Sequence, residues 1–124
     1  MSLSLAARIS AAFVCLGLLF ATSPVSAAGA FAVGKCGAYG QAFDYKGEAA
    51  ARDAAQKQCK GTCETVTMKR ACAALSVDMK NPCGPHGYAV APKISASLNA
   101  ATKKCYEFGG KECVIRAWAC DAKG

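Results

Sequence analysis

Apolar and polar residues alternate in some stretches of the chain and recur with a helical period in others. Residues 30–33 form a short apolar run, and residues 36–43 mix glycine with aromatic side chains, which is typical of paired strands. Residues 48–59 consist almost wholly of strong helix formers. One face of this predicted helix carries only small apolar side chains, at Ala51, Ala55 and Cys59. The pattern predicts a β-hairpin followed by a helix that lies close to a sheet.

Two further strands and a break are predicted after this helix. Residues 64–68 alternate and contain β-branched side chains, and residues 72–77 form a more apolar run. Gly61, in the turn before the first of these strands, suits the C-terminal cap of the helix. Residues 78–82 contain an Asn-Pro pair, which favours a turn. We therefore place the division between two halves of one domain there.

The second half repeats this order with other side chains. Residues 83–90 again place an aromatic residue among glycines and predict a strand. Ser95 is a suitable N-cap for a helix that continues to Cys105. Residues 113–120 alternate as a final strand, in which we expect Trp118 to be the large aromatic anchor.

Cysteine spacing supports an internal duplication. The first and second cysteines of each half are 23 and 22 positions apart, and the third and fourth are 9 and 7 apart. Only the spacing across the turn after the helix differs appreciably, at 4 and 8, and turns accept insertions most readily. We therefore predict a small disulfide-stapled α+β domain with two short helices on an antiparallel sheet of about six strands. Its internal pseudo-twofold repeat would relate residues 30–78 to residues 83–122.

The N-terminal segment has the composition of a secretory signal peptide. Residues 1–27 have a weakly positive start, an apolar core and a small-residue ending. The apolar core is shorter than the roughly 20 residues that a membrane helix needs. Cleavage after Ala27 or Ala28 would remove Cys15 and leave residues 28–124 as a single domain. We predict a secreted or periplasmic protein with no stable membrane anchor after cleavage.

The cysteines that remain after cleavage are even in number. Of nine cysteines, only Cys15 lies in the predicted leader. An even count in an exported chain favours structural disulfides over the two alternatives, a zinc site or a redox-active pair. The candidates are Cys36, Cys59, Cys63, Cys72, Cys83, Cys105, Cys113 and Cys120. We expect no metal and no cofactor.

The pairing of these cysteines cannot be derived from spacing, because eight cysteines allow 105 connectivities. Repeat symmetry favours bridges that join each helix end to the next strand and bridges that close each half. This preferred set is Cys59–Cys63, Cys105–Cys113, Cys36–Cys72 and Cys83–Cys120.

The same residues resemble a known family. Its pattern is a Gly/aromatic opening, an Ala-rich helix that ends in cysteine, a Gly-Cys turn and an apolar strand with an Ala-Cys step, often duplicated. The matching pieces here are residues 30–34, 39–40, 49–59, 63, 71–75, 87–88, 100–105 and 113–120. These look like the secreted bacterial family known as domain of unknown function 4189. The resemblance implies export and a small α+β fold, and it implies no known activity.

Candidate catalytic groups are few. His86 is the only histidine of the chain, and a general base would need a nucleophile such as the serine of a G-x-S-x-G motif, which the sequence lacks. A histidine within a turn is the preferred interpretation. The spacing of the carboxylates selects no acid–base pair among Asp44, Glu48, Asp53, Glu107 and Glu112.

Basic residues outnumber acidic ones by 15 to 8, a net charge of +7 that falls to +6 without the leader. Those near the turns and strands of the two halves form a possible basic surface: Lys57, Lys60, Lys69, Arg70, Lys103, Lys104, Lys111 and Arg116. Their scattered positions favour an ordinary solvated surface over a binding site for an anionic polymer. Nucleic acid is not an expected partner, because no binding motif for it is present.

The sequence therefore predicts a non-enzymatic, disulfide-stabilised module that acts by binding. Its expected partner is an unknown protein or an anionic envelope component. The first alternative is a cationic effector or antimicrobial-type protein that acts on anionic envelope or membrane surfaces. The second alternative is a small hydrolase that uses His86.

Overall fold

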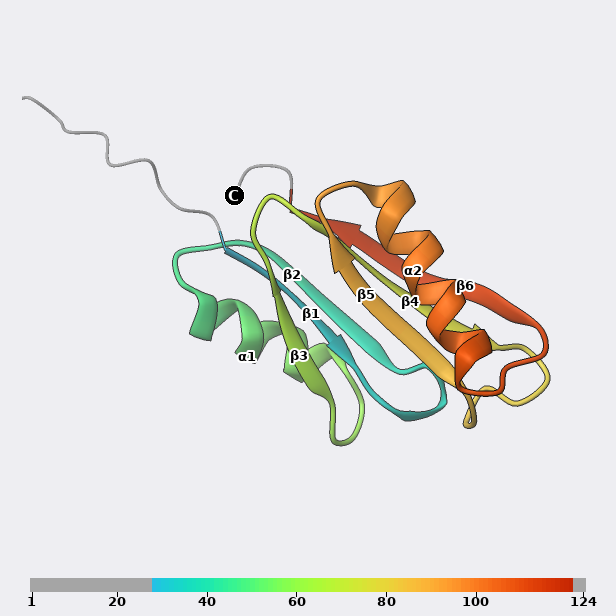
Figure 1. The fold of residues 1–124 in the computed structure, drawn as a ribbon. Helices are drawn as coiled ribbons and strands as arrows, with labels where there is room; N and C mark the ends of the chain where they lie inside the picture. Colours follow the sequence, from blue (N-terminus) through green and yellow to red (C-terminus); the bar gives the residue numbers. More distant parts are fainter. Residues whose placement is uncertain (1–27, 122–124) are drawn as a thin grey trace, which may run out of the picture.

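The computed structural model describes residues 28–121, and the predicted signal peptide, residues 1–27, lies outside the described residues. The described part forms six strands, two α-helices and one short 3-10 helix (Figure 1). In chain order these are β1 (Ala28–Val33), the 3-10 helix (Lys35–Gly37), β2 (Tyr39–Tyr45), α1 (Glu48–Gln58), β3 (Glu64–Met68), β4 (Cys72–Asp78), β5 (His86–Ala91), α2 (Ile94–Glu107) and β6 (Cys113–Cys120). The predicted α+β class, with two helices and six strands, is confirmed.

The strands form two antiparallel three-stranded sheets, with the orders β2-β1-β3 and β5-β4-β6. Each sheet is built by one β-β-α-β segment whose first strand lies in the centre. We call residues 28–68 the first unit and residues 72–120 the second unit. The predicted repeats, 30–78 and 83–122, divide the chain at a different place, because β4 pairs with β5 and β6 and so opens the second unit.

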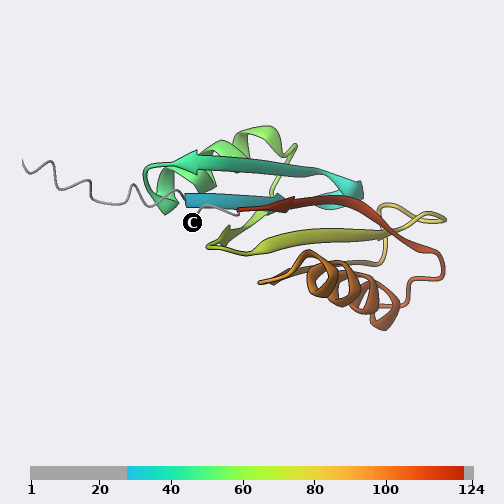
Figure 2. The same cartoon turned by 90° about the horizontal axis from the view of Figure 1, so that it is seen from above.

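The two sheets stack face to face, and each helix covers the outer face of its own sheet (Figure 2). The result is four layers in the order α1, first sheet, second sheet, α2. Both faces of the central strands β1 and β4 are therefore covered, and every residue of these two strands is buried. A strand that is covered on both faces reads as a continuous apolar run, which explains the sequence pattern of both segments.

Side-chain size decides which face of each sheet meets which neighbour. Along β1, Ala30 and Ala32 contact the buried Ala51 and Ala55 of α1, which confirms the predicted small-residue face of that helix. The larger Phe31, on the opposite face of β1, enters the core between the sheets. That core also contains Val33 of β1 and residues from the other strands: Met68, Ala73, Leu75, Val77, Ala117 and Ala119.

Trp118 is not the buried anchor that the alternating pattern predicted. Its side chain is 54% exposed. Trp118 pairs with Ala74, on the face of the second sheet that α2 packs against. Because α2 lies mainly over β4 and β5, the outer face of the edge strand β6 is left largely open. The predicted cap at Ser95 is also wrong, since α2 begins at Ile94 and no side-chain hydrogen bond caps it.

All eight predicted disulfide cysteines are paired in disulfides. The predicted bridges at the helix ends, Cys59–Cys63 and Cys105–Cys113, are confirmed. The other two predicted bridges are wrong. The chain instead forms Cys36–Cys83 and Cys72–Cys120.

Both errors follow from the placement of β4. Because β4 belongs to the second sheet, Cys72 at its start lies opposite Cys120 at the end of β6. Cys36 and Cys83 follow the two central strands, β1 and β4, and their disulfide joins the two units at equivalent positions. Four disulfides are typical of proteins that reside in an oxidising compartment.

Candidate functional site

A surface groove lies where the start of β5 meets the end of α2. Its volume is about 580 Å³, and its lining residues are Gly84, Pro85, His86, Gly87, Tyr88, Lys104, Glu107 and Phe108. We call it the α2 groove. Phe108 borders it with a side chain that is 68% exposed, and the neighbouring Tyr106 is 47% exposed. Single exposed apolar side chains are ordinary, whereas neighbouring ones beside a hollow are a feature of protein contact sites.

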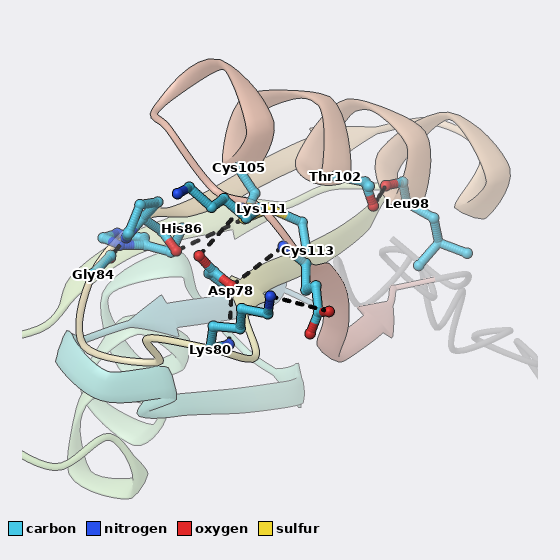
Figure 3. Close-up of a disulfide and its surroundings, with 11 residues drawn as sticks. Asp78, Lys80, Gly84, His86, Leu98, Thr102, Cys105, Lys111 and Cys113 are labelled. Atoms are coloured by element: carbon cyan, nitrogen blue, oxygen red, sulfur yellow. Dashed lines mark hydrogen bonds and ion pairs between the residues drawn. A yellow bond between two sulfur atoms is a disulfide. The ribbon is translucent and has the colours of Figure 1, made fainter.

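The turn that follows Phe108, the C-cap of α2, is held by one buried carboxylate. Oδ1 of Asp78 accepts hydrogen bonds from the backbone N–H of Lys80 at 3.0 Å and of Glu112 at 3.3 Å. Oδ2 accepts from the N–H of Lys111 at 3.2 Å (Figure 3). The bond from Lys80, followed by those from Lys111 and Glu112, holds the pKa of Asp78 below its ordinary value against the opposing effect of burial. The turn is thus fixed to the central strand β4.

His86 opens β5 at the rim of the α2 groove. Its Nδ1 lies 3.3 Å from the carbonyl oxygen of Gly84, a distance at which a protonated Nδ1 donates a hydrogen bond within the turn (Figure 3). Lys104 and Glu107 line the same groove. Sequence reasoning named all three residues separately, and the fold places them around one hollow.

Tyr88 contributes a contact between the two units. Its hydroxyl donates a hydrogen bond to Oε2 of Glu64 on β3 at 2.7 Å. This bond, with smaller contributions from burial and from the charge of Glu64, raises the pKa of Tyr88 above its ordinary value. The side chain is therefore held as a neutral group between the two sheets, and the carbonyl oxygen of Tyr88 faces Lys104 on the α2 side. Sequence reasoning did not single out Tyr88 or Phe108; the longer second turn was the available signal.

Three of the predicted basic residues before β4 lie at the two ends of α1, and the fourth, Arg70, lines a hollow beside Cys72 and Cys120. Nζ of Lys69 lies 2.6 Å from Glu48 at the start of the helix, and this ion pair lowers the pKa of Glu48. Lys57 and Lys60 lie at the opposite end. Because α1 has 11 residues, the two groups are separated by its length, roughly 15 Å at 1.5 Å per residue.

The predicted basic residues of the second unit lie mostly near the end of α2. Nζ of Lys103 lies 3.9 Å from Glu107, and Nζ of Lys104 donates to the carbonyl oxygen of Tyr88 at 3.3 Å. Arg116 instead reaches from β6 to the first unit, where its Nε donates to the carbonyl oxygen of Gly37 at 3.4 Å. α1 and α2 occupy the two outer layers (Figure 2). The basic residues at the ends of α1 and those near the end of α2 therefore lie on opposite sides of the molecule.

A second hollow separates the edges of the two sheets at β2 and β6. Its volume is about 470 Å³, and it is lined by Tyr39, Gln41, Ile115, Arg116, Ala117 and Trp118. We call it the β2–β6 cleft. It shares no lining residue with the α2 groove and lies at the opposite edge of the second sheet. No local sequence pattern predicts this cleft, because its two walls come from different units.

Residues 28–121 include no helix that is long and apolar enough to cross a membrane. A family model described as "Domain of unknown function (DUF4189)" matches residues 28–120. Neither the curated proteins nor the solved structures contain a match to the chain.

Proposed function

The chain belongs to the DUF4189 family, whose description names no activity. From the geometry of the α2 groove, we propose that the protein is an exported module that binds a partner protein without catalysis. The α2 groove is the contact surface. The observation that carries this proposal is the exposed Phe108 beside a preformed hollow. In protein interfaces, a few aromatic side chains next to a pocket commonly supply most of the binding free energy.

The groove has the features that such a contact needs. Its apolar side chains are those of Pro85 and Phe108. Charged side chains at its rim, Lys104 and Glu107, offer both signs of charge to a partner. Asp78 and the Cys105–Cys113 disulfide fix the turn before any partner arrives, so little conformational entropy is lost on binding.

Secretion or transfer to the periplasm is part of this proposal. Its support is the leader-like composition of residues 1–27 together with four disulfides in the described part of the chain. A disulfide-stabilised scaffold of this kind keeps a small binding surface ordered where folding assistance is scarce.

Site-specific photo-cross-linking in cells that make the protein tests this function. A photoreactive phenylalanine analogue replaces Phe108 in one variant and Lys60, in the shorter turn of the first unit, in the matched control. We expect a discrete adduct with one protein at position 108, recovered from the periplasm or the medium, and none at position 60. His86→Ala should weaken the adduct at 108, because His86 lines the same groove. Absence of an adduct at position 108, or identical adducts at both positions, would contradict the proposal.

A further inference from the structure

We propose that the β2–β6 cleft is a second binding site and that its ligand is a carboxylate-bearing sugar of a glycan. Three features support this assignment: one positioned guanidinium group and one amide with an unpaired oxygen in the cleft, and one exposed indole at its edge on β6. None of them belongs to the α2 groove.

Arg116 is held in place by groups of the first unit. Its Nε donates to the carbonyl oxygen of Gly37, and its Cζ lies 5.5 Å from the centre of the Tyr39 ring. Tyr39 in turn stacks on the fully buried Phe31, with ring centroids 6.3 Å apart and planes inclined by 16°. The guanidinium is thus held by one hydrogen bond and by a cation–π contact with Tyr39, whose ring is itself packed on the core residue Phe31.

This fixation leaves the two terminal amino groups of Arg116 available. Within residues 28–121 they make no hydrogen bond or ion pair, and Arg116 is the only charged residue among those that line the cleft. A planar guanidinium with parallel N–H groups can bind a carboxylate through two hydrogen bonds in a bidentate pair. Because the side chain is already held in one conformation, it loses little conformational entropy on binding. The cleft therefore favours a ligand with a planar anionic group.

Trp118 supplies the surface for the rest of the ligand. Trp118, the only tryptophan of the chain, is among the residues that line the cleft; its indole projects from the outer, α2-facing side of the edge strand β6, where the residue is 54% exposed. An indole presents a flat apolar face and one N–H donor. The C–H face of a pyranose ring packs on such a surface while its hydroxyl groups remain free for hydrogen bonds.

Gln41 adds a polar group from the opposite wall. Within the described residues, its buried Oε1 has no hydrogen-bond partner. A buried acceptor without a partner is costly, and the amide loses no side-chain bond when it turns toward a hydroxyl group in the cleft. Carboxylate, apolar ring face and hydroxyl groups together describe a uronic acid or a similar acidic sugar. Because the cleft opens at the molecular surface, it can accept such a unit within a longer chain.

Fluorescence of Trp118 reports directly on this site, because the protein has a single tryptophan. The experiment titrates the oxidised protein with trigalacturonic acid and, separately, with the neutral trisaccharide cellotriose. We expect a saturable change with trigalacturonic acid and at least about tenfold weaker binding of cellotriose, since the Arg–carboxylate contact is lost. Absence of a saturable change, or equal binding of the neutral sugar, would overturn the proposal.

Matched variants separate the cleft from general charge. Arg116→Gln should weaken trigalacturonic acid binding at least about tenfold, and Arg116→Lys should also weaken it, because an ammonium cannot form the two parallel bonds. Arg52→Gln, an exposed substitution on α1 with the same charge change, should leave binding within about twofold. Equal losses in Arg116→Gln and Arg52→Gln would refute the site. Phe108→Ser, in the α2 groove, should leave this binding unchanged, which distinguishes the cleft from the proposed protein contact.

Discussion

The two units use the same device to protect the outer edge of their sheets. In the first unit, the backbone N–H of Gln41 on β2 donates to Oε1 of Gln58 at 3.2 Å. In the second, Nζ of Lys104 donates to the carbonyl oxygen of Tyr88 on β5 at 3.3 Å. Both side chains come from the residue before the helix-end cysteine. An unpaired strand edge invites another strand to add, and a side chain bound to it hinders that addition.

The units differ at the turn after the helix. Gly34 follows β1, and a Cβ on it would lie 2.7 Å from Sγ of Cys63, so the short turn of the first unit leaves no room for a side chain. In the second unit the corresponding position is Asp78, which binds the longer turn through two backbone N–H groups, those of Lys111 and Glu112. The two units therefore share one scaffold, and only the second has a longer turn after its helix, which begins at the exposed Phe108.

A second difference concerns the strand pair that closes each sheet. The last pair of the β4–β6 ladder is the disulfide Cys72–Cys120, whereas the last pair of the β1–β3 ladder, Gly29 and Met68, has no covalent link. Replacing Cys72 and Cys120 with alanine opens a loop of 48 residues, and we expect the free energy of unfolding to fall by about 4 kcal/mol. Urea unfolding, monitored by circular dichroism, measures this change.

The control for this prediction removes a short bridge. Cys59 and Cys63 are only four positions apart, so their replacement with alanine should lower the free energy of unfolding by about 2 kcal/mol. Equal losses in the two double variants would show that loop length does not set the contribution of these disulfides.

Helix packing on the two sheets should be equally sensitive to one added methyl group. A Cβ on Gly40 would clash with the carbonyl oxygen of Ala55, and a Cβ on Gly87 would clash with that of Ala101. Because backbone atoms of a packed helix cannot move aside cheaply, Gly40→Ala and Gly87→Ala should each lower the free energy of unfolding by about 3 kcal/mol. Urea titration with intact disulfides checks both variants.

Gly47→Ala is the matched control for these substitutions. No atom lies within 4 Å of a Cβ at this position, which is the N-cap of α1 in an extended conformation. Its cost should stay under about 1 kcal/mol. A large loss at Gly40 with none at Gly87 would mean that the second helix adapts to its sheet and the first does not.

Local sequence patterns were sufficient for the elements but not for their assembly. The alanine face of α1 and the two helix-end disulfides depend on neighbours within a few turns of chain, and both were predicted correctly. The partners of β4 depend on which sheet it joins, and no local pattern records that choice. For this reason the predicted disulfide partners of Cys36 and Cys72 were wrong.

The candidate sites show the same limit. Alternation in β6 predicted that Trp118 has a buried face, but the exposure of Trp118 depends on how far α2 extends across the sheet. His86, Lys104 and Glu107 were each visible in the sequence, whereas the hollow that they share requires the end of α2 to meet the start of β5.

The smallest predicted effect concerns the carboxylate that distinguishes the second turn. Because folding lowers the pKa of Asp78, its ionised form stabilises the folded protein above the unfolded pKa, about 3.9. This contribution is lost as the pH falls through the lower pKa of the folded state. Asp78→Asn should therefore be less stable than the wild type at pH 7, and the difference should narrow below pH of about 4. Urea unfolding at several pH values across this range measures how the free energy of unfolding of the wild type and of Asp78→Asn depends on pH.

Asp53→Asn, on the exposed surface of α1, is the matched substitution in the first unit and should keep the wild-type dependence on pH. If Asp78→Asn also kept that dependence, the carboxylate would not be the group that fixes the second turn in its ionised form. The conformation of residues 106–112 would then depend on the Cys105–Cys113 disulfide and not on the charge of Asp78. A narrowing difference for Asp78→Asn only would instead show that the longer turn, with its exposed Phe108, is held by a charge that the first unit has no room to accommodate.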